Sequence, residues 1–600
     1  MKIFLFCNYQ TCYEIIRALT EEKVKLVGVL FAPCSPRDLG WKQRIKNLFS
    51  DRSFKEASKL LKKHEIPFHF VDSYNDLEAE SILRKSDADV LLLYGTKIIK
   101  PNILSIPKVG TLNAHSALLP KYRGSKSEFW LLYKNEPQFA GVTIHWVTPG
   151  LDEGDIFLQQ PLKVDVNETP ETLRQKSRSL AGALFVKAIN NIINGAQVRR
   201  PQEEDLATKY KRPSSETLRL FADKYGKYNR IDHATNWLLK SGIQNEPGTK
   251  TITGVDASGS FNAWFDMDKR NYSYIYSEIS GYALTTLLYL YQASKKAVYL
   301  DRANGVASWL LKTQHPAGQF QTAFYMNVDS QRKPENFHTF DTGVILNGLV
   351  NYFRVTSDPN YLSSAKRSAD WLISTMTGDG SVPAMISHKD NSRVDFPDTW
   401  STQSGPYHAK LAIGLLNLFD VTKEIKYQNA ARAFCDYALS KMTQDGQFYT
   451  YESFKSTNFH PHAYTCEGLY VAGKYLNEPR YFDAAKKGTE WAVSLIKNGI
   501  VPRHIFDGNP NYNERVDVMA QIYRLALLFD IKSESMLLLH NNLLSNQYFG
   551  EVQEQRGGFI FGKSSDGKPL EHINSWVTMF ALQAMMLSKS ANGFNEFHLI

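Results

Sequence analysis

Apolar runs and amphipathic stretches alternate along the first 200 residues of the chain. Short runs rich in β-branched and aromatic residues predict strands at residues 2–7, 25–31, 68–71, 89–94, 140–147 and 156–164. Apolar positions at helical spacing predict helices at residues 11–20, 54–64 and 77–84, and a longer helix that Thr169 caps and that stops at Gly195. Strands that alternate with helices form parallel sheets, so we expect an N-terminal α/β domain of the doubly wound kind.

A second pattern begins near residue 231, where pairs of helices recur. One class of helix is apolar on every side and is expected at residues 279–293, 340–354, 405–419, 463–475, 516–529 and 573–587. The other class is amphipathic and carries an aromatic residue late in its length, namely Trp237, Trp309, Trp371, Tyr437 or Trp491. Helices that are apolar all round are buried, so these six, ringed by amphipathic ones, predict an all-α (α/α)6 toroid.

The stretch between the two patterns is polar, carries charges of both signs and has no clear period. We therefore expect three parts: an α/β domain at residues 1–200, a connector at 201–230 and a toroid at 231–600.

Composition narrows the function classes. The 600 residues include 43% hydrophobic and 22% charged side chains, with a formal charge of +9, which is mild for this length and predicts small-molecule partners and no nucleic acid. No stretch approaches the roughly 18 apolar residues of a membrane helix, and the N-terminal apolar run is too short for a signal peptide, so we expect a cytoplasmic protein. Five cysteines without a CxxC pair predict buried thiols and no metal site.

The turn after the first predicted strand excludes one class of cofactor. Residues 7–11 contain no glycine, whereas dinucleotide folds need glycine there so that the pyrophosphate can approach the backbone. An NAD or FAD site is therefore not expected.

Candidate chemistry lies at residues 110–124 and 149–155. Residues 110–113 predict the end of a strand, and alternate residues of a strand share a face, so Asn113 and His115 should point into one space. The loop at 149–155 adds the carboxylate of Asp152. An amide, an imidazole and a carboxylate together form a set that acyl-transfer chemistry can use.

Four fragments in order carry a family resemblance: Asn-Ala-His at 113–115, Leu-Leu-Pro-Lys-Tyr-Arg-Gly at 118–124, Gly-Val-Thr-Ile-His at 141–145 and Leu-Asp-Glu-Gly-Asp at 151–155. Together they resemble the formyltransferases that use 10-formyltetrahydrofolate, a family that includes methionyl-tRNA formyltransferases and sugar N-formyltransferases. The resemblance covers about the first 200 residues.

The resemblance implies roles for particular residues. Asn113 would hydrogen-bond the formyl oxygen, His115 would accept or relay a proton, and Asp152 would orient His115, with no metal required. The pterin of the folate would lie against backbone near a set of residues formed by Leu92, Tyr94, Gly95, Ile98, Asp152 and Asp155. His145 and Glu153 are interpreted as structural.

The toroid offers weaker candidates at the starts of its inner helices, where helix capping alone explains some acidic residues. They are Glu278, Asp341, His408, His462, Glu467, Asp517 and His572. The toroid pattern and the motifs at 263–265 and 276–282 resemble six-hairpin glycosidases, sugar 2-epimerases and glucuronyl 5-epimerases. Two facing carboxylates in the mouth would favour hydrolysis, and two histidines would favour epimerisation.

These observations predict formyl transfer to the amine of an amino sugar, and a nucleotide-linked amino sugar for surface polysaccharide biosynthesis is the leading hypothesis. A tRNA-specific relative would continue into a basic β-barrel, whereas here helices follow. Three alternatives stay open: methionyl-tRNA as the acceptor, a toroid that only binds glycans or serves assembly, and an N-terminal half that is a degenerate folate domain. The sequence leaves the oligomeric state undetermined.

Overall fold

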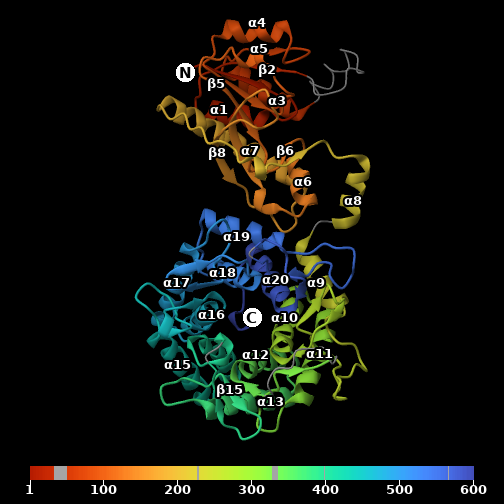
Figure 1. The fold of residues 1–600 in the computed structure, drawn as a ribbon, viewed down its shortest axis with the longest axis vertical. Coiled ribbons are helices and arrows are strands. Elements are labelled where there is room, and N and C mark those ends of the chain that lie inside the picture. The colour runs from red at the N-terminus through yellow and green to blue at the C-terminus, as the bar shows by residue number, and fades with distance from the viewer. Residues whose placement is uncertain (33–50, 226–228, 327–335, 397–398, 565) are drawn as a thin grey trace. The chain divides into compact units, whose positions relative to one another are not determined.

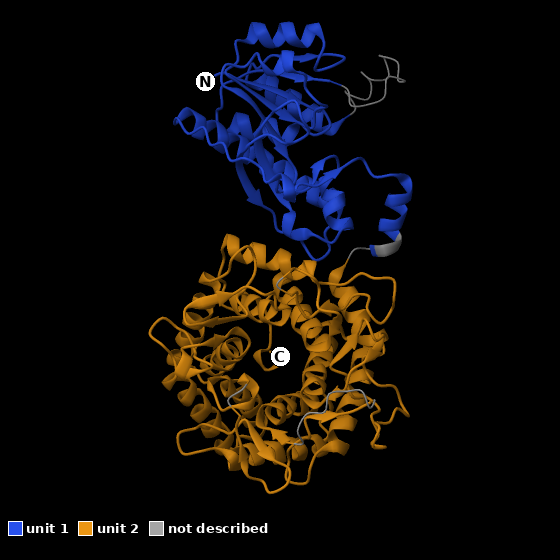
Figure 2. Ribbon diagram, in the orientation of Figure 1, with its two compact units in different colours: residues 1–228 blue, residues 229–600 orange. Residues whose placement is uncertain are grey.

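The computed structural model describes residues 1–32, 51–225, 229–326, 336–396, 399–564 and 566–600. Contacts divide the chain into two compact units, Met1–Tyr228 (unit 1) and Asn229–Ile600 (unit 2), drawn in different colours in Figure 2. Among the described residues, no helix has the length and apolar character needed to cross a membrane.

Unit 1 is built on a seven-stranded sheet with the order β3-β2-β1-β4-β5-β7-β8. The strands are β1 (Ile3–Cys7), β2 (Leu26–Phe31), β3 (Phe68–Phe70), β4 (Val90–Tyr94), β5 (Gly110–His115), β7 (Gly141–Trp146) and β8 (Ile156–Pro161). The first five run parallel, whereas β7 and β8 are antiparallel to their neighbours, so the sheet is mixed. The expected doubly wound α/β fold is confirmed.

Helices cover both faces of this sheet (Figure 1). The alternation of side chains along β1 sends Ile3, Leu5 and Cys7 into one core and Phe4 and Phe6 into the other. The first core also receives α1 (Tyr13–Glu21), α3 (Arg52–Lys63) and α7 (Pro170–Ile193), and the second receives α4 (Leu77–Ser86) and α5 (Pro101–Leu104). Both faces are therefore buried, which leaves the strand ends as the place for a site.

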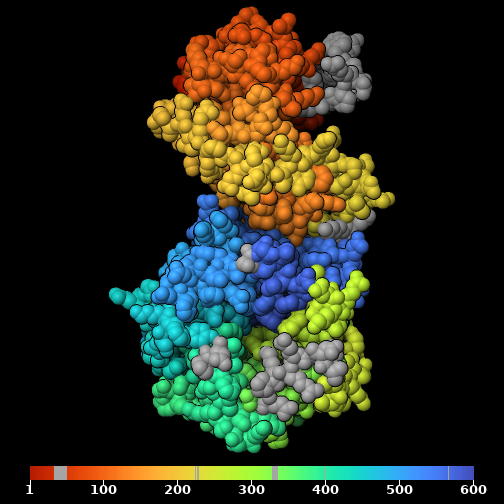
Figure 3. Space-filling view, viewed as in Figure 1, coloured from red at the N-terminus to blue at the C-terminus, as the bar shows by residue number. Residues whose placement is uncertain are grey.

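The segment expected to be a connector is instead part of unit 1. It forms η2 (Glu204–Leu206), β9 (Lys209–Tyr210) and α8 (Ser215–Tyr225), and β9 pairs with β6 (Arg123–Gly124). Tyr210 stacks on Tyr122 with ring centroids 5.0 Å apart, and Phe221 packs on Phe129 of α6 (Ser127–Tyr133) at 5.1 Å. Figure 3 shows the yellow residues of this segment beside the orange residues of unit 1. Aromatic stacking and strand pairing thus hold a segment whose sequence is polar.

Unit 2 is a ring of paired helices (Figure 1). The inner helices are α10 (Ser277–Ser294), α12 (Thr339–Thr356), α14 (Ala412–Thr422, preceded by η4, Pro406–Leu411), α16 (Phe459–Tyr475), α18 (Val516–Leu528) and α20 (Ser575–Lys589). The outer helices are α9 (Arg230–Lys240), α11 (Ala297–Thr313), α13 (Pro359–Thr375), α15 (Ile425–Ser440), α17 (Pro479–Ser494) and α19 (Glu534–Ser545). Each inner helix contacts the next, and α20 closes the ring on α10, so the expected toroid is confirmed.

Short strands lie in the segments that precede the inner helices of the ring. They are β10 (Trp264–Asp266), β11 (Asn271–Tyr272), β12 (Ile275–Tyr276), β13 (Ala323–Phe324), β14 (Asn336–His338), β15 (Met385–Ser387), β16 (Arg393–Val394), β17 (Thr457–Asn458), β18 (His504–Phe506), β19 (Asn509–Asn511), β20 (Phe559–Ile560) and β21 (His572–Asn574). The short helices η1 (Pro137–Phe139), η3 (Trp400–Thr402), η5 (Glu452–Phe454) and η6 (Glu596–His598) complete the described elements.

Candidate functional site

A cleft of about 1100 Å³ opens in unit 1 beyond the carboxyl ends of β1, β4 and β5. Asn113, His115 and Asp152 all line it, together with Tyr94, Gly95 and Ile98. Leu92 is fully buried in the core beneath the sheet, and neither Leu92 nor Asp155 lines the cleft. The strand-end location follows from the parallel topology, because open α/β sheets bind ligands where their strands end.

Asn113 is held by a residue interpreted from the sequence as structural. Asn113 of β5 is the register partner of His145 on β7, and its Nδ2 lies 3.0 Å from His145 Nε2. His145 Nδ1 lies 3.0 Å from the carbonyl oxygen of Trp146, which can only accept, so Nδ1 carries the proton and Nε2 accepts from the amide. One N–H of Asn113 is then fixed, and the other remains to bind an incoming oxygen.

His115 stands between a carbonyl and a carboxylate. Its Nε2 donates to the backbone oxygen of Tyr122 at 2.8 Å, and its Nδ1 lies 3.4 Å from Asp152 Oδ2. Ser127 Oγ, 3.2 Å from Nε2, donates to the same Tyr122 oxygen. A proton on either ring nitrogen therefore has an acceptor in place, which is the arrangement a proton relay needs.

Asp152 ties the two histidines together. Its Oδ1 lies 3.6 Å from His145 Nε2, and its Oδ2 accepts the backbone N–H of Gly124 at 2.9 Å. Burial raises the pKa of this carboxyl, but the neighbouring His115 and His145 side chains and the Gly124 hydrogen bond outweigh the effect of burial and hold the pKa below its usual value. Asp152 is thus an anion within the cleft, and its backbone lies in the left-handed region, with φ of 52°.

One wall of the cleft carries cationic side chains, which were not among the site residues predicted from the sequence. Lys126, Arg174, Arg178 and Arg212 all line the cleft. Arg174 and Arg178 stand four residues apart on α7 and so share a helix face. Arg174 Nε lies 3.8 Å from Glu128 Oε1. Burial and then the charge of Arg174 lower the pKa of Lys126, as expected where cations gather. The i, i+4 spacing of the two arginines was the available sequence signal.

Unit 2 has its own cleft, of about 190 Å³, at the starts of the inner helices. Glu278 and Asp341, two of the sequence candidates, line it. Burial and then the charges of Asp341 and Glu278 raise the pKa of Tyr276, so both carboxylates lie near that phenol. Carboxylates beside aromatic rings form a surface suited to a sugar.

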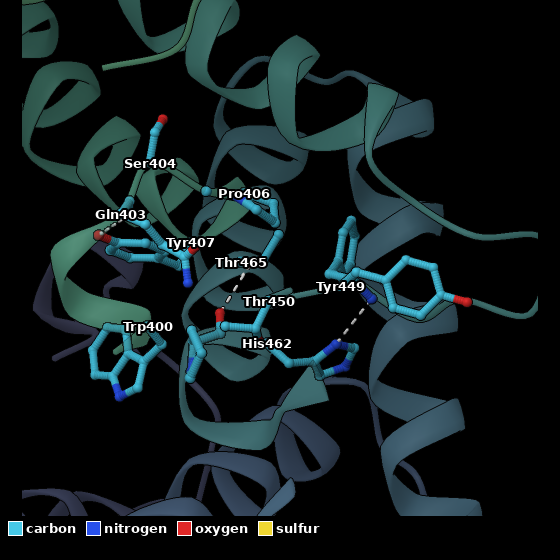
Figure 4. Close-up of a pocket in the computed structure, with 12 residues that line it drawn as sticks. Trp400, Gln403, Ser404, Pro406, Tyr407, Tyr449, Thr450, His462 and Thr465 are labelled. Atoms are coloured by element: carbon cyan, nitrogen blue, oxygen red, sulfur yellow. Dashed lines mark hydrogen bonds between the residues drawn. The ribbon is translucent and has the colours of Figure 1, made fainter. Parts of the chain in front are cut away.

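The three histidine candidates do not line this cleft. His408 Nδ1 donates to the Gly405 carbonyl at 3.1 Å, and burial lowers its pKa to about 3. His462 Nε2 donates to the Gly488 carbonyl at 3.0 Å, and Figure 4 shows its ring beside Tyr449 and turned away from Trp400 and Tyr407. His572 stacks against Phe561 at 5.3 Å and lies outside the lining.

Glu467 belongs to a buried ionic cluster inside the ring. Its carboxylate lies 2.8 Å from Lys410 Nζ and 2.7 Å from Arg524 Nη2, and the side chains of Glu467 and Arg524 are inaccessible to solvent. Burial, and also the nearby Arg524, lower the pKa of Lys410 to about 8, although Glu467 counteracts them. A fully buried, fully paired carboxylate is structural.

Asp517, the remaining candidate, lies behind the cleft wall. It is fully buried and pairs with Arg515, which lines the cleft with His460, Trp400, Tyr407 and Trp576. These lining residues come from four different inner-helix starts, and none of them is among the seven candidates predicted from the sequence. Among the described residues, no group of three or more His, Cys, Asp or Glu side chains is placed to hold a metal ion.

Fold and cleft together place an amide, two imidazoles and a carboxylate at the strand ends of an α/β domain. Comparison with known proteins agrees: residues 1–189 match the family model "Formyl transferase", so unit 1 carries a formyl transferase domain. Residues 262–487 match the model "Beta-L-arabinofuranosidase, GH127 catalytic domain". The expected joining of a formyltransferase domain to a glycosidase-like toroid is confirmed.

The relatives each cover part of the chain. A methionyl-tRNA formyltransferase of Thermotoga maritima is 31% identical over 210 residues, 35% of this chain and 64% of that protein, so less than two thirds of its length is matched. Cellobiose 2-epimerase from Bacillus thermoamylovorans is similar in structure, with a TM-score of 0.48, 14% identity and coverage of 62% of this chain and 100% of that one. An N-formyltransferase from Helicobacter canadensis, solved with folinic acid and dTDP-3-aminofucose, has a TM-score of 0.27 and 19% identity over 35% of this chain and 71% of that one.

Proposed function

We propose that this chain transfers a formyl group from 10-formyltetrahydrofolate to the amine of a nucleotide-linked amino sugar destined for a surface polysaccharide. The observation that carries the proposal is the linked group of Asn113, His145, Asp152 and His115 inside the cleft of a formyl transferase domain.

The proposed reaction exchanges one carbon–nitrogen bond for another. The neutral amine attacks the formyl carbon and forms a new C–N bond, and the carbonyl electrons move to oxygen as a tetrahedral oxyanion. The second N–H of Asn113 would bind that oxyanion. The proton leaves the attacking nitrogen through the His115 and Asp152 pair and is returned to N10 of the folate as the old C–N bond breaks.

The acceptor is inferred from charge. The wall formed by Lys126, Arg174, Arg178 and Arg212 gives the cleft cations beside its reacting group. Guanidinium groups bind phosphates through paired hydrogen bonds, so a sugar linked to a nucleotide diphosphate complements this wall. Its amine would then lie toward Asn113, and the pterin would lie near Tyr94, Gly95 and Ile98.

A second candidate acceptor is methionyl-tRNA, which the Thermotoga maritima relative favours through its name and its 31% identity. RNA phosphates would also complement a cationic wall. Against it, the chain continues after unit 1 into a ring of helices. The nucleotide-sugar proposal is therefore preferred.

A single assay separates the two acceptors. The full-length protein is mixed with 10-formyltetrahydrofolate and with dTDP-, UDP- and GDP-linked amino sugars, or with methionyl-tRNA, and the release of tetrahydrofolate is followed. We expect turnover with at least one amino sugar. Turnover with methionyl-tRNA alone would overturn the sugar proposal, and turnover with none of them would overturn formyl transfer itself.

For unit 2 we propose a sugar-directed role, which the carboxylates and aromatic rings of its cleft support. Catalysis on the sugar and binding without catalysis both fit this surface. Glu278→Ala and Asp341→Ala proteins distinguish them with the amino sugar that unit 1 accepts. A catalytic cleft would lose conversion of the sugar, whereas a binding module would lose affinity and leave the sugar product unchanged.

A further inference from the structure

The cleft of unit 2 contains one guanidinium that is fixed in an unusual way. Asp517 holds one edge of Arg515: its Oδ1 accepts from Nε at 3.0 Å, and its Oδ2 accepts from Nη2. The face of the guanidinium lies over the ring of Phe561, with Cζ 4.2 Å from the ring centroid. The Arg515 side chain is 15% exposed and lines the cleft. Two of its sides are therefore occupied by protein.

The remaining edge of Arg515 is available to a ligand. Within the part of the chain that the structure describes, Nη1 has no hydrogen-bond partner, although Nε and Nη2 are both engaged. An arginine locked in place by a buried carboxylate loses little side-chain entropy when it binds, because its rotamer is already chosen. Such a group is preorganised for the oxygen atoms of an anion.

The same buried carboxylate arranges two other lining side chains. Trp576 Nε1 donates to Asp517 Oδ2 at 3.3 Å, and His460 Nδ1 lies 3.7 Å from the same oxygen. His460 Nδ1 also donates to Gln521 Oε1 at 2.6 Å, which leaves Nε2 as the unprotonated nitrogen of the neutral ring. One inaccessible residue thus positions a cation, an indole and an imidazole around one cavity.

Local charge favours an anion at this position. Burial and then the charge of Arg515 lower the pKa of Arg503, so two guanidiniums lie near one carboxylate. The carboxylates of Glu278 and Asp341 belong to α10 and α12. In the ring order of the inner helices, α12 lies three helices from α18 and therefore on the opposite side of the mouth. The cleft is cationic on one side and anionic on the other.

We infer that the cleft of unit 2 binds a sugar ring carrying an anionic substituent, with the free edge of Arg515 on the anionic group and the aromatic side chains, including Trp576, along the ring. A carboxylate and a phosphate share the required chemistry: both present paired oxygens to a guanidinium. The inference rests on the proposed sugar-directed role of unit 2, and it does not depend on formyl transfer.

The test compares acidic sugars with neutral ones on the full-length protein by calorimetric titration. The probes are glucuronate and galacturonate for the carboxylate, glucose 1-phosphate for the phosphate, and glucose and galactose as neutral controls. We expect at least one acidic probe to bind about tenfold or more tightly than its neutral counterpart, the scale of one charge-assisted hydrogen-bond pair. The preference should fall as salt is raised. The winning probe identifies the anionic group.

Variants assign the preference to the site. Arg515→Gln should remove most of it and Arg515→Lys should keep part, because lysine retains the charge and loses the paired geometry. Arg393→Gln serves as the matched control, since it removes an arginine from an exposed position of unit 2 that does not line the cleft and should leave this preference unchanged. Thermal melting checks that each protein is folded.

Three outcomes would overturn the inference: equal affinity for acidic and neutral sugars, a preference that survives Arg515→Gln, or no binding of any probe. The first and third are read from the wild-type protein, so they stand even when a variant fails to fold. Loss of formyl transfer in a His115→Ala protein with intact binding of the acidic sugar would separate this inference from the proposed reaction of unit 1.

Discussion

Asn113 and His145 face each other across the antiparallel pair of β5 and β7, and the 3.0 Å contact between Asn113 Nδ2 and His145 Nε2 fixes which way the amide points. The orientation depends on His145 donating from Nδ1 to the Trp146 carbonyl. An amide whose N–H direction is set before the substrate arrives is suited to a developing oxyanion, because no reorganisation is needed during the reaction.

Replacing this amide should therefore slow the reaction. Asn113→Ala is expected to lower kcat for formyl transfer about 100-fold or more, the scale found when one oxyanion donor is removed. His145→Ala should lower kcat less, since this substitution only releases the Asn113 amide from its fixed orientation. Asn190→Ala, an exposed position on α7, is the matched control and should retain activity. An Asn113→Ala protein within twofold of wild type would contradict the proposed role.

The His115 and Asp152 pair should be needed for moving the proton. Asp152→Asn keeps the shape of the side chain and removes its charge, so we expect kcat to fall by about 100-fold or more, with a smaller change in KM. Steady-state kinetics with the accepted amino sugar measure this. A variant whose KM rises while its kcat is unchanged would show that Asp152 only binds ligand.

The lowered pKa of Asp152 predicts that the stability of the protein falls with pH under acidic conditions. Its folded-state pKa is lowered, so its stabilising contribution is complete above about pH 4, the unfolded value, and is lost as the pH falls toward the folded pKa. The difference in Tm between wild type and Asp152→Asn should therefore be largest near pH 7 and shrink below pH 4. Melting curves in matched buffers check the trend, and a difference that stays constant with pH would show that the charge of Asp152 is not its cause.

The cationic wall should act on the acceptor's binding. Arg178 lines the cleft, so its guanidinium is placed to bind a phosphate there. Arg178→Gln is expected to raise KM for a nucleotide-linked acceptor about tenfold with kcat little changed, because one charge-assisted hydrogen bond is lost. Lys187→Gln removes a charge from an exposed position of the same helix and is the control. Equal KM values in the two variants would rule out this wall.

The buried cluster of Lys410, Glu467 and Arg524 in unit 2 predicts that the stability of the protein depends on pH under alkaline conditions. Lys410 has a folded pKa of about 8 against an ordinary value of 10.5, so between these two pH values the unfolded chain binds more protons, and stability rises with pH. The rise at pH 10 should be on the order of 1–3 kcal/mol. In Lys410→Met the rise should vanish, while Glu467 keeps its pair with Arg524. Calorimetric melting between pH 7.5 and 10 tests it, and parallel curves for the two proteins would contradict it.

The sequence predicted most of the architecture because burial leaves a clear pattern. The inner helices of unit 2 are apolar on every side, since each is surrounded by protein, and strands such as β1 and β4 are continuous apolar runs for the same reason. The elements of residues 201–225 were not predicted, because β9 has only two residues and α8 is largely exposed, so neither shows a strong hydrophobic period.

The direction of single side chains is what the sequence could not predict. Successive helix residues point about 100° apart, so the start of an inner helix does not reveal which of its residues faces the mouth. Hence Glu278 and Asp341 line the cleft, whereas His462 and Glu467 face other parts of unit 2. The contact by which His145 orients Asn113 could not be predicted, because it depends on the register between β5 and β7, which one strand alone does not show.

The pairing of β6 with β9 determines where the chain can be divided. The Arg123 side chain is inaccessible to solvent, and its hydrogen bonds go to Gln202 and Glu204, which follow residue 200. A fragment that stopped at residue 200 would leave this guanidinium without these partners and would remove the ring that stacks on Tyr122. Since the Tyr122 carbonyl holds His115, such a fragment would be a poor catalyst for a reason unrelated to the loss of unit 2.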